Sequence, residues 1–334
     1  MKITCQQCGK TFVVPDEKIP ANKRVRVQCP GCKTPISLSR PAENAQAAGD
    51  GGQQQLMGEA LIEKILATSK AMPPMPQILT KAREIINDEN KGFQEIAEVL
   101  ETDQAMATRV LRIANSAYYG LTVPASSVRQ AAALLGSQTL LELITLVSMS
   151  RIMGSSLRGY GFPSISVWQH TLAVAMASKT IAEQKYPDLI NDAFNAGLIH
   201  DCGMIVLDEY VTARKGSRQV PAGDEKALLA FEKALLGCDH AETGAAILEK
   251  WNIPQLQTNA IRHHHSPRNS GMEELACILH VSECIAQYGP EIDKIMDSAE
   301  EGVFERLQMP PETVEGIYNS VMGSVEEIVS ELSS

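Results

Sequence analysis

Leu140-Leu-Glu-Leu-Ile-Thr-Leu-Val147 is the stretch that decides the fold of this 334-residue chain. Apolar side chains occupy nearly every position, so a helix built from this stretch has no face suited to water. The pattern therefore predicts a helix at the centre of a helical core. A second apolar pattern, with spacings of mostly three or four residues, predicts an amphipathic helix over 311–332. Its apolar residues are Val314, Ile317, Val321, Val325, Ile328 and Leu332.

The rest of the chain after residue 58 is also helical in pattern. It contains no alternating strand pattern and no internal repeat, which predicts an all-helical domain over 59–334. Residues 41–58 are rich in Ala, Gly and Gln and have no hydrophobic period, so they predict a flexible linker. Residues 1–40 read as a small β module, which makes the chain mainly α with a β appendage.

Composition and charge restrict the class of protein. Hydrophobic residues make up 44% of the chain and charged residues 21%, as in a globular protein. Residues 1–40 carry eight Lys and Arg against Asp16 and Glu17, a net charge of +6, which leaves −16 on the remainder of a chain whose net charge is −10. We find neither an apolar run long enough for a membrane span nor a signal-peptide pattern, and we expect a cytoplasmic protein.

Two cysteine pairs define the β module. Cys5-Gln-Gln-Cys8 and Cys29-Pro-Gly-Cys32 each place two thiolates where they can bind one tetrahedral ion. Strand candidates lie beside them at 11–14 and 25–27. Forty residues bury too little apolar surface to fold alone, and zinc supplies the missing free energy. The sequence predicts a zinc ribbon; two redox-active CxxC pairs are the alternative reading.

The role of this ribbon is less defined than its metal. Its basic residues could contact phosphates, but only Phe12 offers an aromatic surface for stacking a base. A structural or protein-docking role is favoured over nucleic-acid binding. The residues that would make a weak nucleic-acid contact are Lys23, Arg24, Arg26 and Lys33.

The histidines of the helical domain recur mainly near helix ends. His200 and Asp201 end an apolar segment, His240 precedes a predicted helix, and His263 to His265 close another. Imidazoles combined with carboxylates suit first-row divalent ions, and an aspartate can bridge two of them. The pattern suggests a metal site of the kind that hydrolyses phosphate esters.

Several motifs in this region resemble the HDOD domain. They are Met72-Pro-Pro-Met-Pro76, the stretch 103–116, Ala131-Ala-Ala-Leu-Leu-Gly136, Gly197-Leu-Ile-His-Asp-Cys-Gly203, Gly237-Cys-Asp-His240 and Trp251-Asn-Ile-Pro254. The resemblance covers roughly residues 60–290, with an HD-like subdomain at about 160–290. It implies an all-helical bacterial regulatory or signalling module related to the HD-domain phosphohydrolases.

The resemblance also implies a set of metal ligands. His170, His200 and Asp201 match the first three ligands of the HD pattern, and Glu283 stands where the last ligand is an aspartate. The remaining candidates, which match further histidines of the two-metal HD-GYP cyclic-di-GMP phosphodiesterases, are His240, His264 and His265. The implied ion is Fe, Mn or Zn. If the protein is an enzyme, Asp201 and water held by the ions would act in catalysis.

Two departures from the HD-GYP pattern argue against turnover. Met204 stands where those enzymes carry a lysine that meets the substrate phosphate, and Ser266-Pro267-Arg268 replaces their Gly-Tyr-Pro region. The sequence therefore favours a cytoplasmic signalling protein that binds a protein partner or a small ligand without converting it. A metal-dependent phosphohydrolase acting on a nucleotide or cyclic nucleotide is the alternative.

Overall fold

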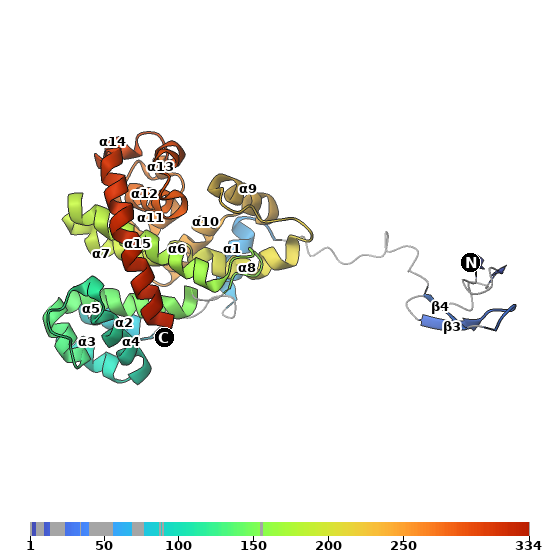
Figure 1. Ribbon diagram of the computed structural model, residues 1–334, viewed down its shortest axis with the longest axis horizontal. Coiled ribbons are helices and arrows are strands. Elements are labelled where there is room, and N and C mark those ends of the chain that lie inside the picture. Colours follow the sequence, from blue (N-terminus) through green and yellow to red (C-terminus); the bar gives the residue numbers. More distant parts are fainter. Residues whose placement is uncertain are drawn as a thin grey trace. The chain divides into compact units, whose positions relative to one another are not determined.

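The computed structural model describes residues 2–4, 10–13, 24–33, 35–39, 56–68, 77–86, 88, 90–153 and 156–333. The chain forms two compact units, Met1–Gln55 and Leu56–Ser334. The second unit is built of helices (Figure 1), which confirms the predicted mainly α fold.

Among the described residues of the first unit, four strands form two antiparallel pairs. Strand β1 (Lys2–Thr4) pairs with β2 (Thr11–Val13), and β3 (Arg24–Gln28) pairs with β4 (Pro35–Ser39). The sequence analysis indicated β2 and β3 but missed their partners, although Ile36-Ser-Leu-Ser39 of β4 alternates apolar and polar residues.

The second cysteine pair lies in a tight turn at the end of β3. The backbone N–H of Gly31 donates to Cys29 Sγ at 3.4 Å, and that of Lys33 donates to the Cys29 carbonyl at 2.9 Å. A thiolate that accepts a backbone N–H is typical of a metal-binding knuckle. Cys5, Cys8 and Lys23 lie outside the described residues, so zinc binding by all four cysteines stays a prediction.

The first half of the helical unit surrounds one long helix. Helix α5 (Val128–Met153) packs against α2, α3 and α4, and its stretch 140–147 is buried throughout, as predicted. The other elements of this half are α2 (Gln77–Ile86), α3 (Phe93–Glu101), α4 (Gln104–Ala114) and the 3-10 turn η2 (Ala117–Tyr119). Helix α1 (Glu59–Ala67) packs instead against α10 (His240–Lys250).

Helix α5 is also long and apolar enough to cross a membrane. Its segment Val128–Ile152 has a mean hydropathy of 1.5, but 61% of that apolar window is buried inside the protein. Gly136, with φ of 83°, interrupts the helical backbone within it. We conclude that α5 is the core helix of a globular domain.

The second half contains the elements that carry the candidate site. Helix α6 packs against α7 and α12, while α10 packs against α8 and α11. The elements are α6 (Ser164–Lys185), η3 (Pro187–Leu189), α7 (Ile190–Ile199), α8 (Cys202–Arg214), α9 (Glu225–Leu236), α10 (His240–Lys250), α11 (Gln255–Arg262), η4 (Pro267–Ser270), α12 (Glu274–Tyr288), α13 (Ile292–Ser298) and α14 (Val303–Leu307).

The last helix, α15 (Pro311–Ser333), joins the two halves. It runs from α13 past α6 to α4, as the red helix in Figure 1 shows. Near its end, Arg112 of α4 donates to the Glu331 carbonyl at 2.9 Å. The predicted apolar stripe from Val314 to Ile328 is buried. The side chain of Leu332 lies outside the described residues.

The start of the helical unit is held by hydrogen bonds to backbone carbonyls. The Gly58 N–H donates to the Leu236 carbonyl at 2.8 Å, and Arg214 donates to the Leu56 carbonyl at 3.1 Å. Residues 56–58, the last of the predicted linker, therefore belong to the helical unit.

Candidate metal centre

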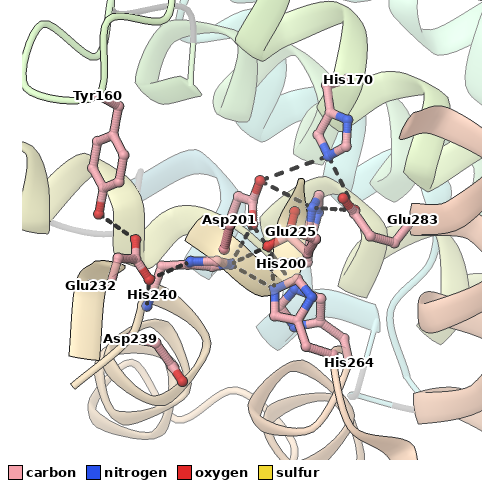
Figure 2. A network of polar contacts seen from close by, with 12 residues as sticks. Tyr160, His170, His200, Asp201, Glu225, Glu232, Asp239, His240, His264 and Glu283 are labelled. Atoms are coloured by element: carbon pink, nitrogen blue, oxygen red, sulfur yellow. Dashed lines mark hydrogen bonds and ion pairs between the residues drawn. The ribbon is translucent and has the colours of Figure 1, made fainter. Parts of the chain in front are cut away.

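The seven ligand candidates of the helical unit lie together, although they span more than a hundred positions. His170 lies within α6, His200 and Asp201 lie where α7 meets α8, and His240 is the first residue of α10. His264 and His265 follow α11, and Glu283 lies in α12. Figure 2 shows six of these side chains pointing toward one another.

One group of donors surrounds Glu283. Its Oε2 lies 3.1 Å from His170 Nε2 and 3.3 Å from His200 Nε2. Asp201 Oδ2 lies 3.2 Å from His200 Nε2 and 3.8 Å from His170 Nε2. The extra methylene of Glu283, relative to an aspartate, thus lets its carboxylate reach both imidazoles.

A second group lies on the other side of Asp201. Its Oδ1 is 3.4 Å from His240 Nε2 and 4.0 Å from His264 Nε2. The Nε2 atoms of His240 and His265 are 2.7 Å apart, which is a hydrogen-bond distance. Each oxygen of Asp201 therefore faces a different group of imidazoles.

One buried imidazole shows that this donor set fits a metal ion. His264 Nδ1 lies 2.6 Å from the Ile261 carbonyl, which places the ring proton on Nδ1 and a lone pair on Nε2. The side chain is fully buried, and within the described part of the chain its Nε2 makes no hydrogen bond. His200 Nδ1 lies 2.8 Å from the Gly197 carbonyl, so its Nε2 faces the carboxylates of Asp201 and Glu283. A buried ring nitrogen without a partner is unfavourable unless a cation binds it.

The carboxylates and imidazoles shift one another's pKa strongly. Burial alone would lower the pKa of His200, but Asp201 and Glu283 outweigh it and hold that pKa well above its ordinary value. Burial would raise the pKa of Asp201, yet His200 outweighs it and the pKa lies below the usual range. Burial together with the neighbouring charge of His200 lowers the pKa of His264 to about 3. Such opposed shifts are common at functional sites.

Two residues that position His240, Glu232 and Tyr160, were not predicted from the sequence. Glu232 is fully buried in α9; its Oε2 lies 2.8 Å from His240 Nδ1 and accepts the His240 backbone N–H at 2.9 Å. Its Oε1 accepts the Tyr160 hydroxyl at 2.5 Å (Figure 2). A carboxylate that binds the rear nitrogen of an imidazole orients the ring and increases its basicity toward a metal.

The contact between Glu232 and His240 predicts a pH dependence for the metal-free protein. Burial lowers the pKa of His240, but Glu232 outweighs it and raises that pKa to about 10. A raised histidine pKa adds stability that is fully present below the unfolded value near 6.5 and is lost as pH rises toward 10. We expect Glu232→Gln to reduce stability below pH 6.5 and to flatten the alkaline decline, measured by thermal unfolding with chelator present.

Glu249→Gln, a change at an exposed carboxylate of α10, is the control and should follow the wild-type profile. An unchanged alkaline decline in Glu232→Gln would show that His240 does not depend on this carboxylate.

His280, one turn from Glu283, has a structural role. Its Nδ1 lies 2.7 Å from the His264 carbonyl, and its Nε2 accepts the Glu300 N–H at 2.9 Å. Both ring nitrogens are thus used, and the residue positions the loop that carries His264.

A cavity of about 190 Å³ opens beside the donors. His170, Asp201, His240 and Glu283 form one part of its wall. The rest is largely apolar and includes Leu157, Phe162, Val167, Met204 and Leu228. None of the described residues that line this cavity is Lys or Arg.

Comparison with protein-family models assigns the chain to a family. A family model for the HDOD domain matches residues 72–267, and one for a zinc-ribbon domain matches residues 1–37. Since the first match covers more than half of the sequence, the chain belongs to the HDOD domain family. A relative from Treponema pallidum (strain Nichols), an uncharacterized protein, is 23% identical over 203 residues. That alignment covers 58% of this chain but only 38% of the relative's length.

Solved structures share the fold of the helical unit. One from Shewanella amazonensis SB2B, named as a candidate phosphohydrolase, has a TM-score of 0.66 at 21% identity and covers 82% of this chain and 98% of its own. An HDOD domain protein of unknown function from Geobacter sulfurreducens has a TM-score of 0.64 at 22% identity, covering 82% and 96%. A candidate signal transduction protein from Marinobacter aquaeolei VT8 has a TM-score of 0.58 at 21% identity, covering 79% and 60%.

Proposed function

We propose that this chain is a bacterial, cytoplasmic signal-transduction protein. Its HDOD unit holds divalent metal and binds a small ligand or a protein partner without converting it. The cavity beside the donors carries this proposal, because its apolar and acidic wall contains no Lys or Arg among the described residues. Met204 lines that wall. A phosphate group in the cavity would meet no Lys or Arg side chain among the described residues.

Direct assays test the absence of turnover. We expect full-length protein loaded with Mn²⁺ to leave bis(p-nitrophenyl) phosphate and cyclic di-GMP intact, as followed by chromatography of the reaction products. Hydrolysis that requires metal and is abolished by His200→Ala would contradict the proposal.

The position of Asp201 favours a second candidate, a metal-dependent phosphohydrolase. Its two oxygens face two separate groups of imidazoles, as a bridging carboxylate does in a two-metal site. Ions bound there would polarise a phosphate ester and lower the pKa of water. Asp201, Glu283 and the imidazoles would hold the ions, and the apolar wall of the cavity would limit the access of bulk water.

The ribbon is proposed to hold one structural zinc ion and to serve in docking. We expect Cys29→Ser to remove that ion, counted by elemental analysis, and to leave metal at the helical unit unchanged, because the knuckle geometry involves Cys29 directly. Asp201→Ala should keep the ribbon zinc and lose the metal of the helical unit. Retention of the ribbon zinc in Cys29→Ser would contradict the assignment.

A further inference from the structure

Glu225, the first residue of α9, points a carboxylate oxygen at the second group of imidazoles. Its Oε1 lies 3.3 Å from His265 Nε2 and 4.0 Å from His240 Nε2. Within the described part of the chain this buried oxygen makes no hydrogen bond. The HDOD and HD-GYP motifs in the sequence do not include this residue, and no ligand role follows for it from them.

A simple hydrogen bond between Glu225 and His265 does not explain the arrangement. The same His265 Nε2 lies 2.7 Å from His240 Nε2, while His240 Nδ1 already faces Glu232. His264 Nε2, fully buried and without a hydrogen bond, belongs to the same group. One cation would satisfy these three nitrogens and the Glu225 oxygen together, whereas protons would leave at least one of them unpaired.

We propose that Glu225 is an additional carboxylate ligand of the second ion. This inference rests on the proposed metal-binding function and names a donor for it. The ligand atoms of His240, His264 and His265 lie within 4.8 Å of one another and form one candidate group. Asp201 Oδ1 and Glu225 Oε1 lie beside this group and would add two carboxylate donors.

Helix α9 is built to present this carboxylate. Glu225 and Glu232 are seven residues apart, so both lie on the same face of the helix, with Leu228 buried between them. The Asp224 side chain accepts the Ala227 N–H at 3.0 Å and fixes the start of the helix. One face of α9 thus supplies a ligand and, two turns on, the carboxylate that orients His240.

As a ligand, Glu225 would also connect the second ion to the loop 215–224, which precedes α9. Pro221, Gly223 and Asp224 of this loop line the cavity beside the site, and Gly223 and Asp224 also line a second cavity of about 350 Å³ on the other side of Glu225. An ion bound to Glu225 would hold the end of this loop in place. Metal occupancy then changes the mobility of a cavity wall, which is the kind of change that a signalling protein can transmit.

Two substitutions of Glu225 test the inference with Mn²⁺ as the probe. Glu225→Gln keeps the size of the side chain and removes its charge, whereas Glu225→Asp keeps the charge and withdraws the carboxylate. Titration calorimetry of the full-length chain should show both variants binding the second Mn²⁺ at least about tenfold more weakly than wild type. Hydrogen exchange in the loop 215–224, slowed by Mn²⁺ in wild type, should not slow in either variant.

Asp297→Asn is the matched control. Asp297 lines the second cavity but not the first, so its loss should leave the affinity for both ions unchanged. Wild-type affinity in Glu225→Gln would overturn the inference while leaving the metal-binding proposal intact, provided that Asp201→Ala loses the ions. Weak binding in Glu225→Gln with wild-type binding in Glu225→Asp would also overturn it, because charge and not ligation would then be responsible. A wild-type protein without metal at this site would overturn both proposals.

Discussion

Asp201→Ala is expected to remove both ions of the helical unit and to leave the zinc of the ribbon. Asp201 is the one candidate donor with an oxygen near each group of imidazoles, at 3.2 Å from His200 and 3.4 Å from His240. Removing it takes a ligand from each ion and the negative charge between them. We expect metal affinity to fall more than about a hundredfold, counted by elemental analysis after dialysis against a weak chelator.

The same substitution should destabilise the metal-free protein. His200 and His240 have raised pKa values partly because Asp201 neutralises their charge. Without Asp201, buried imidazolium groups lose a partner or must release their protons. Breaking a buried charge pair typically lowers the free energy of unfolding by about 3–5 kcal/mol. Glu301→Gln, at an almost fully exposed carboxylate, serves as the control and should change neither property. Full metal content in Asp201→Ala would rule out a bridging role.

The sequence was sufficient for the helical architecture because its patterns are local. The stretch 140–147 is apolar on all sides and is buried on all sides. The capping-box pattern of Asp239 and Glu242 sets the start of α10 and hence the place of His240. Motif order identified the residues that meet at the candidate site, since those motifs carry the family resemblance.

The roles of Glu225 and Glu232 in α9 were not predicted from the sequence, and the reason is physical. Glu225-Lys226 and Glu232-Lys233 look like the solvated face of an ordinary surface helix. Only the packing of α9 against α8 and the loop after α11 brings these two glutamates to buried imidazoles. One signal was available: Glu225, Leu228, Glu232 and Leu235 share a helical face, so two carboxylates lie on an apolar stripe. Acidic residues on a buried stripe indicate a buried partner.

Gly203→Ala is expected to cause the largest loss of stability of any single methyl addition near the site. A Cβ at Gly203 would lie 2.0 Å from the His240 carbonyl oxygen and 2.7 Å from the Gly244 nitrogen. Both are backbone atoms of α10, so they cannot rotate away as a side chain would, and α8 and α10 must separate. We expect the free energy of unfolding to fall by about 3 kcal/mol or more, measured by chemical denaturation.

The damage should extend to the metal site, because α10 begins at His240 and α8 follows Asp201 directly. Separating these helices moves the imidazole of one from the carboxylate of the other, and metal binding should weaken in the folded fraction. Gly323→Ala in α15 is the matched control: no atom outside its own helix lies within 4 Å of the added Cβ. Alanine there should stabilise the protein by about 0.5–1 kcal/mol, since glycine is unfavourable inside a helix. If Gly203→Ala matched this control in stability and metal affinity, the close contact of α8 with α10 would not be what holds Asp201 against His240.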